Sequence, residues 1–156
     1  WLAFGPCATA AALLVLHPQG SAAVPWPTAW LLGAGPALAT TLVLFCSHFH
    51  QVEQDEVHGK RSPVVRLGTH RAAGLVPWWV AATLALEWVP LLFGVWPPEV
   101  LMSGLGLPAA MQLIRLLQRH HDQPDRISGS KFLALRFQLF NGIGLMLGLA
   151  LPGLYR

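Results

Sequence analysis

The sequence predicts an all-α membrane protein, a polytopic bundle of about five transmembrane helices. Of its 156 residues, 54% are hydrophobic and 11% are charged, against roughly 25% charged in an ordinary soluble domain. The apolar residues gather in five runs, most of them close to the roughly 20 residues that cross a bilayer as a helix. We therefore expect one membrane domain over residues 1–156, with spans at about 1–17, 29–50, 72–96, 98–118 and 132–154.

The first run is the shortest because the chain begins inside it, at Trp1 and without an initiator Met. We expect the chain to be the C-terminal part of a longer protein. The later runs all contain Gly or Pro, which would weaken a helix in water. In a membrane, close packing and neighbouring polar groups compensate for these residues, so the helical interpretation stands. In chain order, the Gly and Pro residues of these four runs are Gly33, Gly35 and Pro36; Pro77 and Pro90; Gly104, Gly106 and Pro108; Gly142, Gly144 and Gly148.

The connections between the runs differ in charge. Lys and Arg gather after the second run and between the fourth and fifth, whereas connections 18–28 and 97–99 contain neither. The positive-inside rule then puts both charged connections on the cytoplasmic or stromal side of a plasma, thylakoid or plastid membrane. Trp1 is expected inside and Arg156 outside. Trp residues near the expected helix ends are typical of an aromatic belt; they are Trp26, Trp30, Trp78, Trp79 and Trp96.

Several function classes are disfavoured by composition. The net charge of +3 comes from few charged residues concentrated in two stretches, which does not indicate a nucleic-acid-binding face. Cys7 and Cys46 both fall in apolar segments and behave as small hydrophobic residues, so they indicate neither a metal site nor an oxidising compartment. The two polar connections are therefore where soluble chemistry can occur.

The connection over roughly residues 48–71 carries most of the expected chemistry. Its first part should continue the preceding helix, which would place Gln51 and Asp55 on one face, with His48 one turn earlier. Glu53 would point elsewhere unless the helix unwinds. Carboxylates followed closely by Lys and Arg suit a diphosphate, because carboxylates hold Mg²⁺ and cations contact the remaining phosphate charge.

A plainer interpretation of this connection is a set of solvated residues at a helix exit, which its composition fits equally well. Metal binding by its four His residues is disfavoured, since they lack a Cys-containing or His-Glu-x-x-His pattern. The sequence His120-His121-Asp122 resembles a metal cluster, but adjacent residues on a helix do not share a face. A solvated loop is the better interpretation there.

Other polar residues lie inside the expected spans. Glu87 falls past the midplane of the third span, and an intramembrane acid is a functional candidate by default, with an outer-interface position as the alternative. Lys131 is a further candidate for phosphate binding. A larger set occupies the inner halves of the last two spans, where interface anchoring and helix-to-helix hydrogen bonds are favoured over substrate contact. It consists of Gln112, Arg115, Arg136, Gln138 and Asn141.

Residues 51–69, QVEQDEVHGKRSPVVRLGT, resemble the second aspartate-rich motif of the UbiA-type intramembrane prenyltransferases, with its acidic cluster, Gly-Lys pair and Val-Arg-Leu-Gly ending. Within that superfamily they are most similar to the cyanobacterial and plastid MenA branch, the naphthoate or naphthoquinone phytyltransferases, whose loops begin with a similar His-Phe-His-Gln. Residues 131–134 and 140–142 also resemble the last helix of that branch. The resemblance covers essentially the whole chain but only the C-terminal part of a fold of about nine helices.

The resemblance implies Mg²⁺-dependent transfer of a prenyl group, phytyl in this branch, from its diphosphate to 1,4-dihydroxy-2-naphthoate or 2-carboxy-1,4-naphthoquinone in phylloquinone or menaquinone synthesis. Diphosphate and CO₂ are lost. Asp55 is then the first candidate Mg²⁺ ligand and Glu53 the second, while Gln51 stands where the usual pattern has another Asp. The candidate catalytic residues are Asp55, Glu53 and Lys60, and the candidate diphosphate-binding residues are Lys60, Arg61, Arg66 and Lys131.

The expected partners are the prenyl diphosphate, the aromatic acceptor, the lipid bilayer and the N-terminal half of the same fold. The family's first aspartate-rich motif is expected upstream of Trp1, so we expect the chain alone to be inactive. Two alternatives stay open from the sequence. One is a UbiA-type prenyltransferase of the homogentisate or chlorophyll type. The other is a small transporter or membrane-assembly subunit, which the absence of an internal repeat disfavours.

Overall fold

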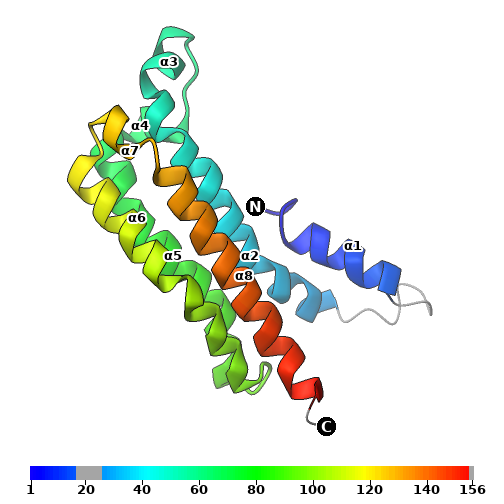
Figure 1. Cartoon of the computed structure of the whole chain (residues 1–156). Helices are drawn as coiled ribbons and strands as arrows, with labels where there is room; N and C mark the ends of the chain where they lie inside the picture. The colour runs from blue at the N-terminus through cyan, green and yellow to red at the C-terminus, as the bar shows by residue number, and fades with distance from the viewer. Residues whose placement is uncertain (17–25, 155–156) are drawn as a thin grey trace.

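A computed structural model describes residues 1–16 and 26–154 (Figure 1). These residues form helices and no strand, which confirms the all-α polytopic bundle expected from the sequence. Four helical segments in the described part are long and apolar enough to cross a membrane. The first expected span contains only an 11-residue helix, α1 (Pro6–Leu16), which is too short to cross a bilayer. The described part therefore has four crossing segments and, in the first expected span, the shorter apolar helix α1; most of connection 18–28 and Arg156 lie outside it.

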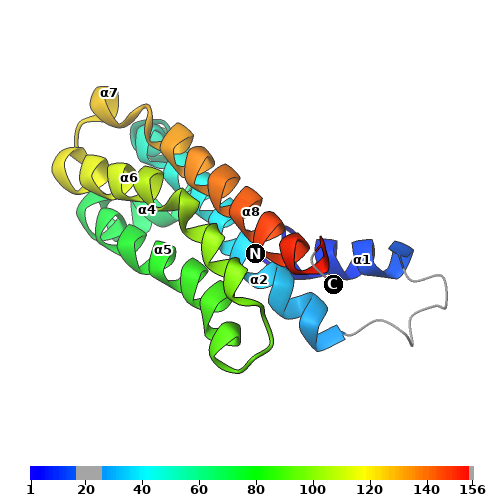
Figure 2. The same ribbon diagram turned by 60° about the horizontal axis from the view of Figure 1, so that its bottom comes forward.

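The remaining elements follow in chain order. They are α2 (Trp26–Ser47), the 3-10 turn η2 (Phe49–Gln51), α3 (Val52–Val57), α4 (Pro63–Leu67), α5 (Thr69–Leu92), the 3-10 helix η3 (Pro98–Gly106), α6 (Leu107–His120), α7 (Pro124–Ile127) and α8 (Ser130–Leu154). The long helices α2, α5, α6 and α8 run side by side, and α1 lies against α2 at the edge of the bundle (Figures 1 and 2). The α3–α4 segment and α7 lie together at one end of the bundle, so the two charged connections share that end.

The fourth span begins as a 3-10 helix, whereas its apolar run predicts one regular helix. Pro108, the second residue of α6, has no backbone N–H, so it cannot donate the bond that would continue one regular helix across this junction. η3 packs backbone to backbone against α8. A Cβ atom at Gly144 would meet the Met102 carbonyl group, and one at Gly148 would meet the Glu99 carbonyl group. Small residues four apart on α8 therefore permit this close approach, as is common between membrane helices.

Trp79 departs from the expected aromatic belt. Its indole Nε1 donates a hydrogen bond to the Leu38 carbonyl oxygen at 2.9 Å, and its ring stacks on Phe45 with centroids 5.2 Å apart. The indole thus joins α5 to α2 instead of marking an interface. By contrast, Trp78 is exposed on the other side of α5, as a lipid-facing residue should be.

Glu87 is buried between helices and is 3% exposed. Asn141 Nδ2, on α8, donates to Glu87 Oε2 at 2.8 Å and to the Ser103 carbonyl oxygen at 3.3 Å. Trp88 Nε1 donates to Ser103 Oγ at 2.9 Å. A Cβ at Gly35 would lie 2.7 Å from Glu87 Oε1, so the missing side chain on α2 makes room for the carboxyl group. This polar cluster links α2, α5, η3 and α8.

Replacing Asn141 with Ala is expected to destabilise the bundle by about 1–2 kcal/mol, because the substitution removes both donated bonds and leaves Glu87 Oε2 unsatisfied. Thermal unfolding in detergent would measure the change. Gln118→Ala is the matched control, since Gln118 is an exposed amide on α6. Equal unfolding temperatures for the two variants would show that the cluster does not stabilise the fold.

Candidate functional site

The site begins where α2 ends. Ser47 Oγ donates to the Leu44 carbonyl oxygen at 2.6 Å, and the chain then tightens into η2, with Gln51 N donating to the His48 carbonyl oxygen at 3.2 Å. Phe49 is buried and packs edge-on against Phe45 with ring centroids 5.7 Å apart. The buried ring holds the turn against the bundle, so the start of α3 is fixed relative to α2.

This turn changes the expected positions of the acidic residues. The sequence spacing predicts that the second span continues as one helix, with Gln51 and Asp55 on one face. Instead, Gln51 precedes α3 with φ −105° and ψ 2°, outside the helical region. The 3-10 turn η2, which contains the buried Phe49, interrupts the regular helix at this point. Within α3, Glu53 is exposed whereas Asp55 is buried.

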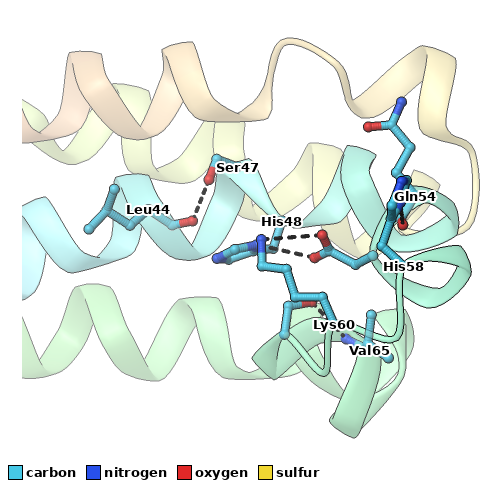
Figure 3. Close-up of polar contacts among 9 residues, drawn as sticks. Leu44, Ser47, His48, Gln54, His58, Lys60 and Val65 are labelled. Atoms are coloured by element: carbon cyan, nitrogen blue, oxygen red, sulfur yellow. Dashed lines mark hydrogen bonds and ion pairs between the residues drawn. The ribbon is translucent and has the colours of Figure 1, made fainter.

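Asp55 lies close to His48 and Lys60, which Figure 3 labels, and to the Ser62 side chain. Lys60 Nζ lies 3.3 Å from Asp55 Oδ1, and His48 Nδ1 lies 3.5 Å from Asp55 Oδ2. The Asp55 residue is 6% exposed, whereas the Lys60 side chain is 57% exposed. A turn through Gly59, whose φ is +67°, lets Lys60 N donate to the Asp55 carbonyl oxygen at 2.7 Å. The turn therefore brings the predicted cation to the predicted metal ligand.

The second half of the motif is anchored by α4. Ser62 caps this helix, its Oγ accepting from Val65 N at 3.5 Å, and Gly68 ends it with φ +75°. Val64 is fully buried and packs into the core. Arg61 and Arg66, on either side of this anchor, are exposed and form no ion pair within residues 1–16 and 26–154. Both guanidinium groups are thus available to an anion at this end of the bundle.

Lys131 reaches the same end from the last helix. Ser130 Oγ, at the start of α8, donates to the Cys46 carbonyl oxygen at 3.4 Å, which ties that start to the end of α2. Lys131 lies near enough to His50 for their charges to interact. Its Nζ sits 5.3 Å from the centroid of the Phe132 ring. Among the candidate cations, Lys60 and Lys131 thus come from segments far apart in sequence but lie at one end of the bundle.

We tested whether these residues fit a magnesium ion. The described residues contain no group of three or more His, Cys, Asp or Glu that could hold a metal. Mg²⁺ needs fewer protein ligands, because one or two carboxylates suffice when substrate phosphate and water fill the other positions. Asp55 Oδ2 is buried without a hydrogen-bond partner among the described residues, since 3.5 Å to His48 exceeds a good hydrogen bond. This oxygen fits one carboxylate ligand of Mg²⁺.

An apolar groove runs along α8 away from this end. One part of it is lined by Leu135, Gln138, Leu139, Gly142, Ile143 and Met146. The adjoining part shares Gly142 and Met146 and has Leu32 and Pro36 of α2 on its other side. An open apolar groove of this kind can hold part of a hydrocarbon chain.

The sequence places His48 near the face that carries Asp55 but assigns it no role. Its spacing of seven from Asp55 would put both on one face of a continuous helix, and this was the available signal. The spacing was compatible with many pairings, and the actual contact depends on the turn η2.

The comparisons with known proteins agree with the motif. The sequence pattern of the UbiA prenyltransferase family matches residues 1–141. The chain is 35% identical over 153 residues to the 2-carboxy-1,4-naphthoquinone phytyltransferase of Synechocystis sp., covering 98% of this chain and 48% of that protein. It is 36% identical over 153 residues to the chloroplastic 2-carboxy-1,4-naphthoquinone phytyltransferase of Arabidopsis thaliana, covering 96% of this chain and 40% of that protein.

The chain thus spans about half the length, or less, of these two curated relatives. No solved structure gives a significant match. The family match covers most of the chain, and both relatives confirm the resemblance to the phytyltransferase branch. With its four apolar crossing segments in the described residues, the chain is an integral membrane protein. It belongs to the UbiA prenyltransferase family.

Proposed function

We propose that the protein containing this chain transfers a phytyl group from its diphosphate to 2-carboxy-1,4-naphthoquinone or 1,4-dihydroxy-2-naphthoate, releasing diphosphate and CO₂. The product would serve phylloquinone or menaquinone synthesis. The observation that carries the proposal is the buried Asp55 carboxylate, which has one oxygen without a hydrogen-bond partner in the described residues and a Lys60 ion pair on the other. The names of the two relatives support the choice of phytyl donor and naphthoquinone acceptor.

The charged end of the bundle would bind the diphosphate. Bound Mg²⁺ would supply positive charge to stabilise the departing diphosphate. Asp55 would hold the ion through Oδ2, with Glu53 as the second carboxylate if α3 turns, and with the Gln51 amide oxygen as a weaker ligand. Lys60 would exchange Asp55 for a phosphate oxygen. The other cations that would contact phosphate are Arg61, Arg66 and Lys131.

The groove along α8 would hold the isoprenoid tail. Its lining is almost entirely apolar, so it would keep water away from the allylic carbon on which positive charge develops. We further propose that the N-terminal half of the fold, with the first aspartate-rich motif, covers this groove. The chain spans 48% and 40% of its two relatives, and for this reason we expect it to be inactive alone.

The orientation in the membrane is proposed from charge. The charged end of the bundle, which carries α3, α4 and α7, would face the cytoplasm or stroma by the positive-inside rule. The name of the Arabidopsis relative places that relative in the chloroplast, which is compatible with a thylakoid or plastid membrane for this protein.

Incubation of the full-length protein with labelled phytyl diphosphate tests the function. With Mg²⁺ we expect released CO₂ and a phytylated naphthoquinone from 2-carboxy-1,4-naphthoquinone, or the corresponding phytylated naphthoquinol from 1,4-dihydroxy-2-naphthoate. Homogentisate and a chlorophyll precursor are the competing acceptors and should give no product. A product from either competitor, with none from the naphthalene acceptors, would assign the protein to another branch of the family. The chain expressed alone, given the same substrates, should show no turnover.

A further inference from the structure

We propose that His48 is a positioning residue, whose imidazole holds the Asp55 carboxylate in the orientation that binds the metal ion. The inference rests on the proposed function, because it takes Asp55 as a magnesium ligand. It adds a residue outside the acidic cluster, to which neither the motif nor the comparisons assign a role. The geometry that carries it is the approach of His48 Nδ1 to Asp55 Oδ2 at 3.5 Å.

His48 stands on a rigid part of the protein. It follows the 22-residue helix α2 directly, and its backbone N donates to the Phe45 carbonyl oxygen at 3.2 Å while its own carbonyl oxygen accepts from Gln51 N. The neighbouring Phe49 ring is buried in the core. The His48 side chain is 24% exposed, and its Nδ1 atom is buried with no hydrogen-bond partner in the described part of the chain. The imidazole nitrogen is therefore held in place facing the carboxylate.

Asp55, in contrast, lies on a short helix that is not stable by itself. Helix α3 has six residues, and in an isolated helix of that length the few hydrogen bonds do not offset the conformational entropy lost in forming the first turn. The cation beside Asp55, Lys60, has a long and mostly exposed side chain. When Lys60 contacts a phosphate, as proposed above, the His48 imidazole stays beside Asp55. Outer-shell partners of this kind orient a ligand before the metal arrives.

Two other groups lie near the carboxylate. The Ser62 hydroxyl lies beside Asp55 and can donate to it while its oxygen accepts from Val65 N, so Ser62 is a neutral contact on the α4 side and His48 is the contact on the α2 side. His58 lies three residues after Asp55, yet its Nδ1 is 2.7 Å from the Gln54 carbonyl oxygen and so is bound within its own turn. His58 is therefore a matched control: a histidine in the same connection without contact to the carboxylate.

The test measures metal binding directly rather than turnover. Mn²⁺ is titrated into the full-length protein in detergent, with inorganic diphosphate present, and free Mn²⁺ is followed by electron paramagnetic resonance. We expect His48→Ala to weaken Mn²⁺ binding by about 10–100-fold, the usual effect of removing an outer-shell partner. His48→Asn should recover most of the loss, because its amide nitrogen can take the place of Nδ1. His58→Ala should bind Mn²⁺ like the wild type.

Asp55→Asn separates this inference from the proposed function. If Asp55→Asn loses Mn²⁺ binding while His48→Ala keeps it, the positioning role is wrong and the metal site stands. If Asp55→Asn also binds Mn²⁺ like the wild type, the proposed metal site itself is wrong. Equal losses in His48→Ala and His58→Ala would show a general disturbance of the connection and overturn the assignment. If His48→Ala does not fold, the comparison of His48→Asn with His48→Leu decides, since Leu fills space without a donor.

Discussion

Asp55→Asn in the full-length protein is expected to lower kcat/KM for prenyl transfer by about 10³-fold, the scale on which loss of one key electrostatic group acts in an active site. The substitution keeps the shape of the side chain but removes its negative charge. The buried oxygen that lies opposite His48 could no longer hold a divalent cation firmly. The loss should appear mainly in turnover, because charge on the leaving diphosphate grows as the bond to the prenyl group breaks.

Steady-state kinetics with saturating acceptor would measure this effect, and Mg²⁺ titration would show whether excess metal restores part of it. Asp122→Asn is the control, since Asp122 is an exposed carboxylate in the other charged connection at the same end of the bundle. Its activity should stay within about twofold of the wild type, as for ordinary exposed surface changes. Near-wild-type kcat/KM in Asp55→Asn would remove Asp55 from the metal site and leave Glu53 as the first candidate.

Much of the fold was predictable because the bilayer imposes a length and a composition on each crossing segment. The apolar runs marked α2, α5 and α8 within a few residues. What the runs could not show is local geometry. The start of the fourth span is a 3-10 helix whose backbone lies directly against Gly144 and Gly148, a contact that depends on a helix some forty residues later in the chain.

The candidate site was predictable to the extent that it is local. Asp55 and Lys60 are five residues apart with Gly59 between, so their ion pair follows from the motif and its turn. The exposed position of Glu53 follows from helical spacing. The position of Lys131 at this end of the bundle could not be predicted from local spacing, because it depends on the hydrogen bond that the Ser130 hydroxyl donates to the end of α2.

Glu87 is a second residue whose contacts could not be predicted from the sequence. An intramembrane carboxyl group is a functional candidate from sequence, yet here it is buried against Asn141 of α8 and Gly35 of α2. No pattern within α5 reveals those partners, because both belong to other helices. Its polar contacts are between helices, so we assign the residue to the packing of the bundle.

Gly144→Leu is expected to be the most disruptive single change in the described bundle. A Cβ atom at this position would coincide with the Met102 carbonyl group and come within 2.8 Å of the Ser103 Cα. These are backbone atoms, so no side-chain rotation relieves the overlap and η3 must move away from α8. Overpacking usually lowers the free energy of unfolding by about 1–3 kcal/mol, and we expect a clash with backbone atoms to lower it by about 3 kcal/mol or more.

Gly142→Leu provides a control on the same helix, because a Cβ at Gly142 meets nothing within 4 Å. Both substitutions replace Gly with the same good helix former, so intrinsic helix propensity changes equally and the difference between them reports packing alone. Thermal unfolding in detergent, followed by size-exclusion chromatography, should show Gly144→Leu unfolding at a lower temperature than Gly142→Leu. If the two variants unfold together, η3 does not pack against α8 as closely as described. A lower temperature for Gly144→Leu alone would instead establish that this glycine sets the distance between η3 and α8, and with it the position of Asn141 opposite Glu87.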